Sequence, residues 1–110
     1  MPGLHGGEWV VVGEDAERLR RMASRVQSTQ AAAILRIAAD TLEDLAYRLM
    51  QGHAPSTMIR TLESLESLMN IYSLPTGPVR RARRILLSKV RDQYESMFTG
   101  DDLIGLGLPA

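Results

Sequence analysis

The chain has 110 residues, of which 45% are apolar and 24% are charged, so we expect one globular domain with a buried core. Thirteen basic and thirteen acidic side chains cancel, which excludes a whole-molecule field that would attract nucleic acid or anionic lipid. The chain contains no cysteine, which excludes a disulfide framework and a thiolate metal site.

The sequence also indicates where the protein is located and whether it binds a metal or a cofactor. No apolar run approaches the roughly 18 residues that a membrane span needs. Residues 1–7 also lack the charged and apolar regions of a signal peptide. We therefore expect a cytoplasmic protein with no membrane partner. The two histidines, His5 and His53, have no second ligand type at helical spacing, so we expect no metal site and no cofactor.

Residues 1–13 predict a flexible N-terminal arm, because three glycines and a proline fall within the first seven positions. Segment 8–12 is rich in valine, carries a tryptophan and is closed by Gly13, which predicts an extended, strand-like segment. Such a strand could dock on the helices, pair with its copy in a dimer or add to a partner's sheet edge. Trp9 and Val11 are therefore candidate oligomer or partner contacts.

Residues 14–98 predict an all-α domain, a single four-helix bundle or a close variant. Apolar residues recur at three-and-four spacing in four segments, about 14–27, 28–51, 56–73 and 76–97. Ser28 or Thr29 is expected to cap the second helix, Gly52 to stop it, and Ser56 to cap the third helix.

Two helices carry patterns that bear on packing. Ile37 and Tyr47 lie outside the main apolar stripe of the second helix, which indicates cover on two sides. In the fourth helix, Pro78 suits the first turn. The buried face of that helix is expected to hold Val79, Ala82, Leu86, Val90, Tyr94 and Met97.

The fourth helix carries the strongest local charge signal. Its first turns hold Arg80, Arg81, Arg83 and Arg84, and Arg91 lies near two of them on the helical wheel. These guanidinium groups repel one another, and the helix N-terminus disfavours cations, so we expect a compensating anion.

Three alternatives remain open for the surroundings of these arginines: phosphate backbone, carboxylates of the same chain or a second protomer, and plain solvation. The candidate carboxylates are those of Glu43, Asp44, Glu63, Glu66, Asp101 and Asp102. Of these, Glu63 and Glu66 are expected on a solvent-exposed helix face.

Catalytic signals are missing from the sequence. No serine or threonine sits in a strand-to-helix elbow beside a base, and no glycine-rich loop has the Walker spacing with its lysine. We therefore expect no catalytic residues, and a protein that is not an enzyme.

Residues 99–110 predict an apolar tail, whose Leu103, Ile104 and Leu106 are further candidate oligomer or partner contacts. The string TGDDLIGLGLP over 99–109 resembles a motif in the C-terminal helical region of bacterial tRNA nucleotidyltransferases, the CCA-adding and poly(A) polymerase family. This resemblance implies tRNA contact by a helical tail. It implies no nucleotidyl transfer, because the paired aspartates of the family's catalytic domain have no counterpart in this sequence.

Together these patterns predict a non-catalytic helical module for protein–protein interaction or oligomerisation, with a second copy or another protein as its partner. The alternative is an accessory protein that binds RNA or DNA backbone through the cluster Arg80–Arg84.

Overall fold

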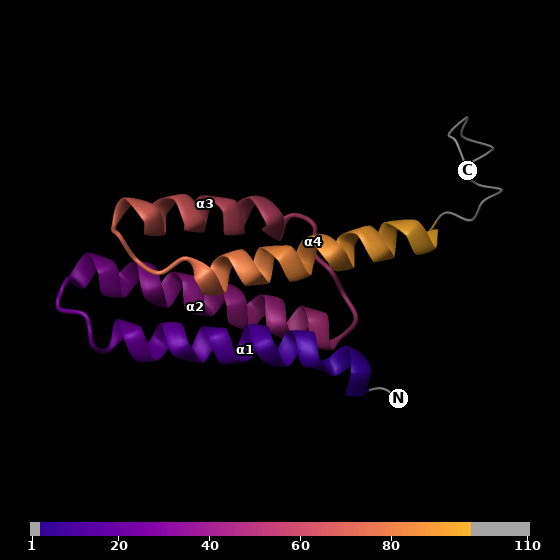
Figure 1. Ribbon diagram of the computed structural model, residues 1–110, viewed down its shortest axis with the longest axis horizontal. Helices are drawn as coiled ribbons and strands as arrows, with labels where there is room; N and C mark the ends of the chain where they lie inside the picture. Colours follow the sequence, from indigo (N-terminus) through magenta and orange to yellow (C-terminus); the bar gives the residue numbers. More distant parts are fainter. Residues whose placement is uncertain (1–2, 98–110) are drawn as a thin grey trace.

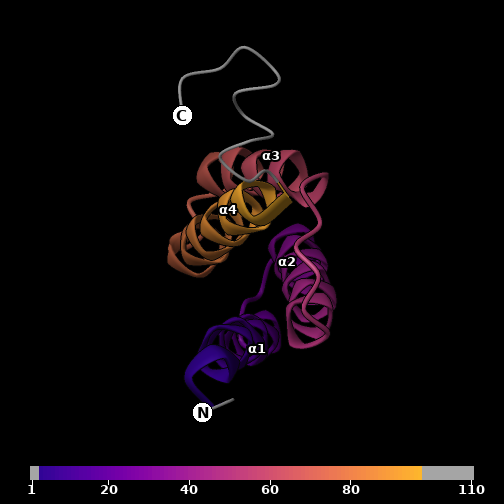
Figure 2. The ribbon, with the colours of Figure 1, turned by 90° about the vertical axis from the view of Figure 1, so that its right-hand side faces the viewer.

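The computed structural model describes the backbone of residues 3–97 and the side chains of residues 7–95. Four α-helices follow one another: α1 Gly3–Ala23, α2 Thr29–Met50, α3 Met58–Ile71 and α4 Gly77–Met97 (Figure 1). α1 packs mainly on α2, and α3 packs mainly on α4, so the chain forms two helical hairpins (Figure 2). This arrangement confirms the prediction of an all-α, four-helix bundle-like fold.

The core consists almost entirely of aliphatic side chains, and α2 supplies more of it than any other described helix. Leu35, Leu42 and Leu45 of α2 are all fully buried. The other helices contribute Val12, Ala16, Leu19 and Ala23 from α1, Leu62, Leu65 and Met69 from α3, and Val79, Ala82 and Leu86 from α4. The predicted apolar stripes of the four helices therefore meet in one cluster.

The prediction of a strand-like segment at 8–12 is wrong, because α1 already begins at Gly3. Val12 is fully buried, and it continues the stripe of Ala16 and Leu19 backwards by one helical turn. Packing of this stripe on α2 outweighs the β-propensity of the three valines, since propensity is weaker than tertiary context.

Gly13 lies inside α1 and does not close a strand. A Cβ added to Gly13 would lie 4.0 Å from the Cβ of Ala46, which is an ordinary van der Waals distance. The missing side chain is therefore not required for the close approach of α1 and α2.

The helix ends follow the predicted chemistry in part. Ser28 caps α2, and its hydroxyl oxygen accepts a hydrogen bond of 3.2 Å from the amide of Ala31. Gly52, at φ +80°, ends the same helix, and the amide of His53 donates to the carbonyl of Arg48 at 2.9 Å. The predicted cap at Ser56 is wrong, because Thr57 is the capping residue of α3 and makes no side-chain cap bond.

Some apolar side chains remain uncovered. Ile37 and Tyr47, expected to be covered by a second layer, are 53% and 56% exposed. Tyr94, expected on the buried face of α4, is 57% exposed. Among the described side chains, α4 contributes to the core as far as Val90, which is partly buried, and the predicted core residue Met97 lies outside them.

Candidate interaction surfaces

The arginines at the start of α4 reach carboxylates of the neighbouring helices. Arg80 Nε lies 2.8 Å from Glu66 Oε2, and Arg83 Nη1 lies 2.7 Å from Glu66 Oε1. The side chain of Glu66 is only 13% exposed. The hydrogen bond from Arg80 and the charge of Arg83 hold the pKa of Glu66 below its usual value, although burial acts in the opposite direction.

A second ion pair joins the first and last helices. Asp15 of α1 is 1% exposed, and its two carboxylate oxygens accept hydrogen bonds from Arg81 Nε at 2.7 Å and Arg81 Nη2 at 3.2 Å. Arg18, one turn along α1, donates to Asp15 Oδ1 at 2.9 Å. The hydrogen bonds that Arg81 donates to Asp15, together with the negative charge of Asp15, raise the pKa of Arg81. The buried carboxylate is thus fully engaged by two guanidinium groups.

Three of the four clustered arginines therefore pair with carboxylates of the same chain. Glu66 was among the candidate carboxylates, but its expected solvent exposure is wrong. Asp15 was not foreseen as a partner. The spacing of Asp15 could have indicated that it is buried, because it precedes the buried Ala16 and follows the buried Val12 by three residues. Arg84 and Arg91 are exposed and make no ion pair within the described residues.

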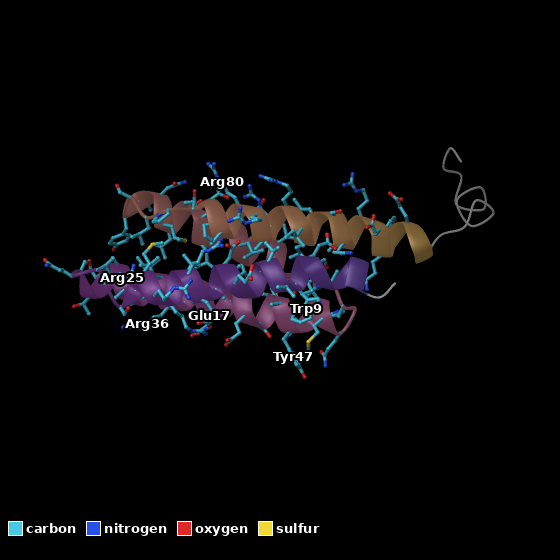
Figure 3. All side chains as sticks on the ribbon, turned by 60° about the horizontal axis from the view of Figure 1, so that its bottom comes forward. Trp9, Glu17, Arg25, Arg36, Tyr47 and Arg80 are labelled. Carbon is cyan, nitrogen blue, oxygen red and sulfur yellow. The ribbon has the colours of Figure 1, made fainter. Side chains whose placement is uncertain are left out.

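A shallow groove of about 390 Å³ runs between α1 and α2 on the surface of the first hairpin. We call it the α1–α2 groove, and it is lined by Trp9, Val10, Gly13, Glu14, Glu17, Glu43, Ala46, Tyr47 and Met50. Val10, Tyr47 and Met50 are 40%, 56% and 48% exposed, so the apolar part of the lining is open to solvent. Figure 3 shows Trp9, Glu17 and Tyr47 along this side of the molecule.

One end of the α1–α2 groove is acidic. Arg20 donates to Glu43 Oε2 at 3.0 Å, to Asp40 Oδ1 at 2.7 Å and to Glu17 Oε1 at 3.3 Å. The hydrogen bonds that Arg20 donates to Glu43 and Asp40 raise the pKa of Arg20. The single guanidinium group of Arg20 therefore forms ion pairs with three carboxylates. The carboxylate of Glu14 makes no ion pair within the described part of the chain. This end keeps an excess of negative charge.

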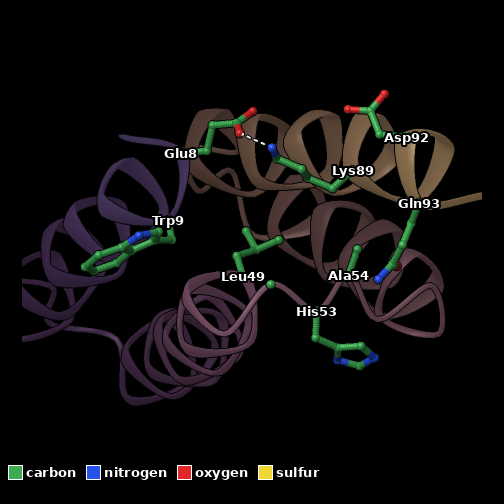
Figure 4. A pocket seen from close by; sticks show the side chains of 9 residues that line it. Glu8, Trp9, Leu49, His53, Ala54, Lys89, Asp92 and Gln93 are labelled. Atoms are coloured by element: carbon green, nitrogen blue, oxygen red, sulfur yellow. Dashed lines mark ion pairs between the residues drawn. The ribbon is translucent and has the colours of Figure 1, made fainter. Parts of the chain in front are cut away.

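A second pocket, of about 330 Å³, lies where α1, the end of α2 and α4 meet (Figure 4). Glu8 and Lys89 form an ion pair of 2.6 Å at its edge. The ring of His53 points away from this pair, so the pocket does not bring a base to a nucleophile (Figure 4). We assign no chemistry to it.

The other predicted site residues differ in whether they line a pocket. Trp9 is partly buried and lines both pockets. Val11 is 36% exposed and lines neither. The candidate contacts Leu103, Ile104 and Leu106 lie outside the described residues. No group of three His, Asp or Glu side chains within the described residues is close enough to hold a metal ion. None of the four helices, as far as they are described, has the length and hydropathy of a membrane span.

Comparisons with protein-family models, curated proteins and solved structures found no match to this chain. The resemblance of residues 99–109 to tRNA nucleotidyltransferases lies outside the described residues and stays a prediction.

Removal of the buried carboxylate tests the link between α1 and α4. We expect Asp15→Ala to lower the free energy of unfolding by about 1–3 kcal/mol, because hydrogen bonds to charged groups are lost at a buried position. The matched control is Asp44→Ala, which removes an exposed pair with Arg48 and costs about 0.3–0.5 kcal/mol. Urea unfolding measures both values, and equal losses would show that burial adds nothing to the Asp15 contacts.

The lowered pKa of Glu66 predicts a pH-dependent stability. The folded state favours the ionised carboxylate, so its stabilisation is complete above the usual pKa of 4.5 and is lost as the pH falls through the lower folded value. Glu66→Gln should therefore be less stable than wild type at pH 7, and the difference should shrink below about pH 4.5. Thermal unfolding across this range measures it. Glu63→Gln, exposed on the same helix, should match wild type throughout, and a constant deficit for Glu66→Gln would contradict the assignment.

Proposed function

We propose that the chain is a non-catalytic helical module for protein–protein interaction, and that the α1–α2 groove is its contact surface. The observation that carries this proposal is the exposure of Val10, Tyr47 and Met50 side by side with Trp9 on two rigid helices. Large apolar and aromatic side chains gathered in a groove are typical anchors of protein contacts. Single exposed apolar residues elsewhere need no such explanation.

The chemistry of the groove also suits a protein partner. Its floor is apolar and its acidic end is supplied by Glu14, Glu17 and Glu43, so a helix with apolar and basic residues on one face would fit it. The aromatic rings of Trp9 and Tyr47 offer contact area at low conformational cost. The expected cytoplasmic location stays a prediction.

Site-specific photo-cross-linking tests the proposal. A benzoyl-phenylalanine placed at position 47 should form adducts of protein mass on irradiation of cells that produce the chain, with the partner identified by mass spectrometry. The control position is Ile71 on α3, which is 75% exposed and lies outside the groove. A specific adduct at position 47 alone supports the proposal, whereas no protein adduct, or the same adducts at both positions, would refute it.

Nucleic-acid binding is the second candidate, and one observation favours it. Arg84 and Arg91 are exposed, unpaired within the described residues, and two helical turns apart on one face of α4. Arg81 and Arg83, by contrast, are held by Asp15 and Glu66 and are less available to phosphate. Nucleic-acid binding would therefore depend mainly on Arg84 and Arg91, and not on the whole cluster Arg80–Arg84 that the sequence suggested.

Fluorescence anisotropy with a labelled DNA duplex tests this second candidate. Two phosphate contacts predict that log affinity falls against log salt with a slope of about −2. The paired change Arg84→Ala with Arg91→Ala should abolish that salt dependence. Arg25→Ala, at an exposed arginine of the first hairpin, is the control and should leave it unchanged. Affinity that is the same at low and high salt would exclude phosphate binding by this face.

A further inference from the structure

The solvent face of α4 carries a regular stripe of basic and apolar residues. We call it the α4 stripe: Arg80, Arg84, Leu87, Arg91 and Tyr94, spaced alternately by four and three residues. This spacing places all five on one face of the helix. Leu87 is 46% exposed and Tyr94 is 57% exposed, so the face is both basic and apolar.

The charges of the α4 stripe and the α1–α2 groove are opposite. Arg84 and Arg91 have no ion-pair partner within the described residues, whereas the groove has more carboxylates than the single Arg20 can neutralise. Each surface also exposes apolar side chains, Leu87 on the stripe and Val10, Tyr47 and Met50 in the groove. Opposite charges around matched apolar surface favour association and fix its register.

The order of residues along the two surfaces also agrees. In the groove, α2 runs from the acidic end at Glu43 to the apolar end at Tyr47 and Met50, a rise of about 10 Å over seven residues. In the stripe, α4 runs from Arg84 through Leu87 to Tyr94, about 15 Å over ten residues. An α4 laid parallel to α2 therefore places Arg84 near Glu43, Leu87 over the apolar floor and Arg91 at the level of Met50.

The two surfaces face away from each other. Figure 3 shows Tyr47 and Arg80 projecting from opposite sides of the molecule. One rigid copy therefore cannot exchange both surfaces with a single neighbour. A contact between groove and stripe is heterologous, and such contacts build rings or open chains rather than two-fold dimers.

We propose that the α1–α2 groove of one copy receives the α4 stripe of a second copy, so that the chain assembles head to tail. The inference rests on the proposed function, since it names the partner of the same groove. The second copy is the occupant that the structure itself supplies, because the chain carries both complementary surfaces, and Arg84 and Arg91 of the stripe and Glu14 of the groove make no ion pair within the described residues.

Complementary variants test the head-to-tail geometry. The groove variant Tyr47→Ser with Met50→Ser keeps an intact stripe, and the stripe variant Arg84→Glu with Leu87→Ser keeps an intact groove. Wild type should grow beyond two copies as concentration rises in sedimentation velocity, and growth should weaken with salt. Each variant alone should remain at the monomer mass of 12.2 kDa, and an equimolar mixture should stop at a complex of two copies. Ile71→Ser is the control and should assemble as wild type does.

The outcomes separate this inference from the proposed function. A wild type that stays monomeric, a wild type that stops at two copies, or a variant mixture that stays monomeric overturns head-to-tail assembly. If wild type stays monomeric and position 47 still cross-links to a different protein, the groove binds that protein and the proposed function stands. If wild type stays monomeric and position 47 forms no protein adduct, both fail.

Discussion

The carboxylate of Asp15 constrains the arrangement of the whole bundle. Each hairpin could pack its own apolar faces, and the contact between the hairpins is divided over three helix pairs, each less extensive than the packing within either hairpin. Asp15 lies at that junction, almost fully buried, and Arg81 reaches it from a position 66 residues away in the chain. Loss of Arg81 would leave this buried carboxylate with Arg18 alone, so relative positions of α1 and α4 that keep the contact are favoured.

The same constraint explains why the arginine cluster is divided. Arg81 is held toward α1 by Asp15, and Arg80 and Arg83 converge on Glu66 of α3. The first turns of α4 are therefore joined by ion pairs to both α1 and α3. Arg84 and Arg91 are left for solvent or a partner, and they lie on the face of α4 that also exposes Leu87. Along α4, ion pairs within the chain are therefore made by Arg80, Arg81 and Arg83, whereas Arg84 and Arg91 make none within the described residues.

Sequence patterns predicted the helix count and much of the core, because burial in an all-α fold follows the three-and-four spacing that α2 and α3 show clearly. They failed at residues 8–12, where the valines favour a strand locally but the spacing of Val12 and Ala16 places both on the buried face of a helix. Exposure of Glu66 was also mistaken, since helix periodicity cannot show which carboxylate an arginine on another helix will reach. The groove depended on how far α1 extends, so it became visible only when Trp9 and Val10 were placed on a helix beside Tyr47.

Gly13 lowers the stability of α1 and shapes the α1–α2 groove. Glycine inside a helix costs about 0.5–1 kcal/mol relative to alanine, and the space beside Ala46 would accept an alanine methyl group. The residue is therefore not explained by packing between α1 and α2. It lines the α1–α2 groove, where a bare backbone keeps the floor low between Trp9 and Glu17. α1 is therefore less stable at Gly13 than it would be with alanine, at a position where an added methyl group would reach the floor of the groove.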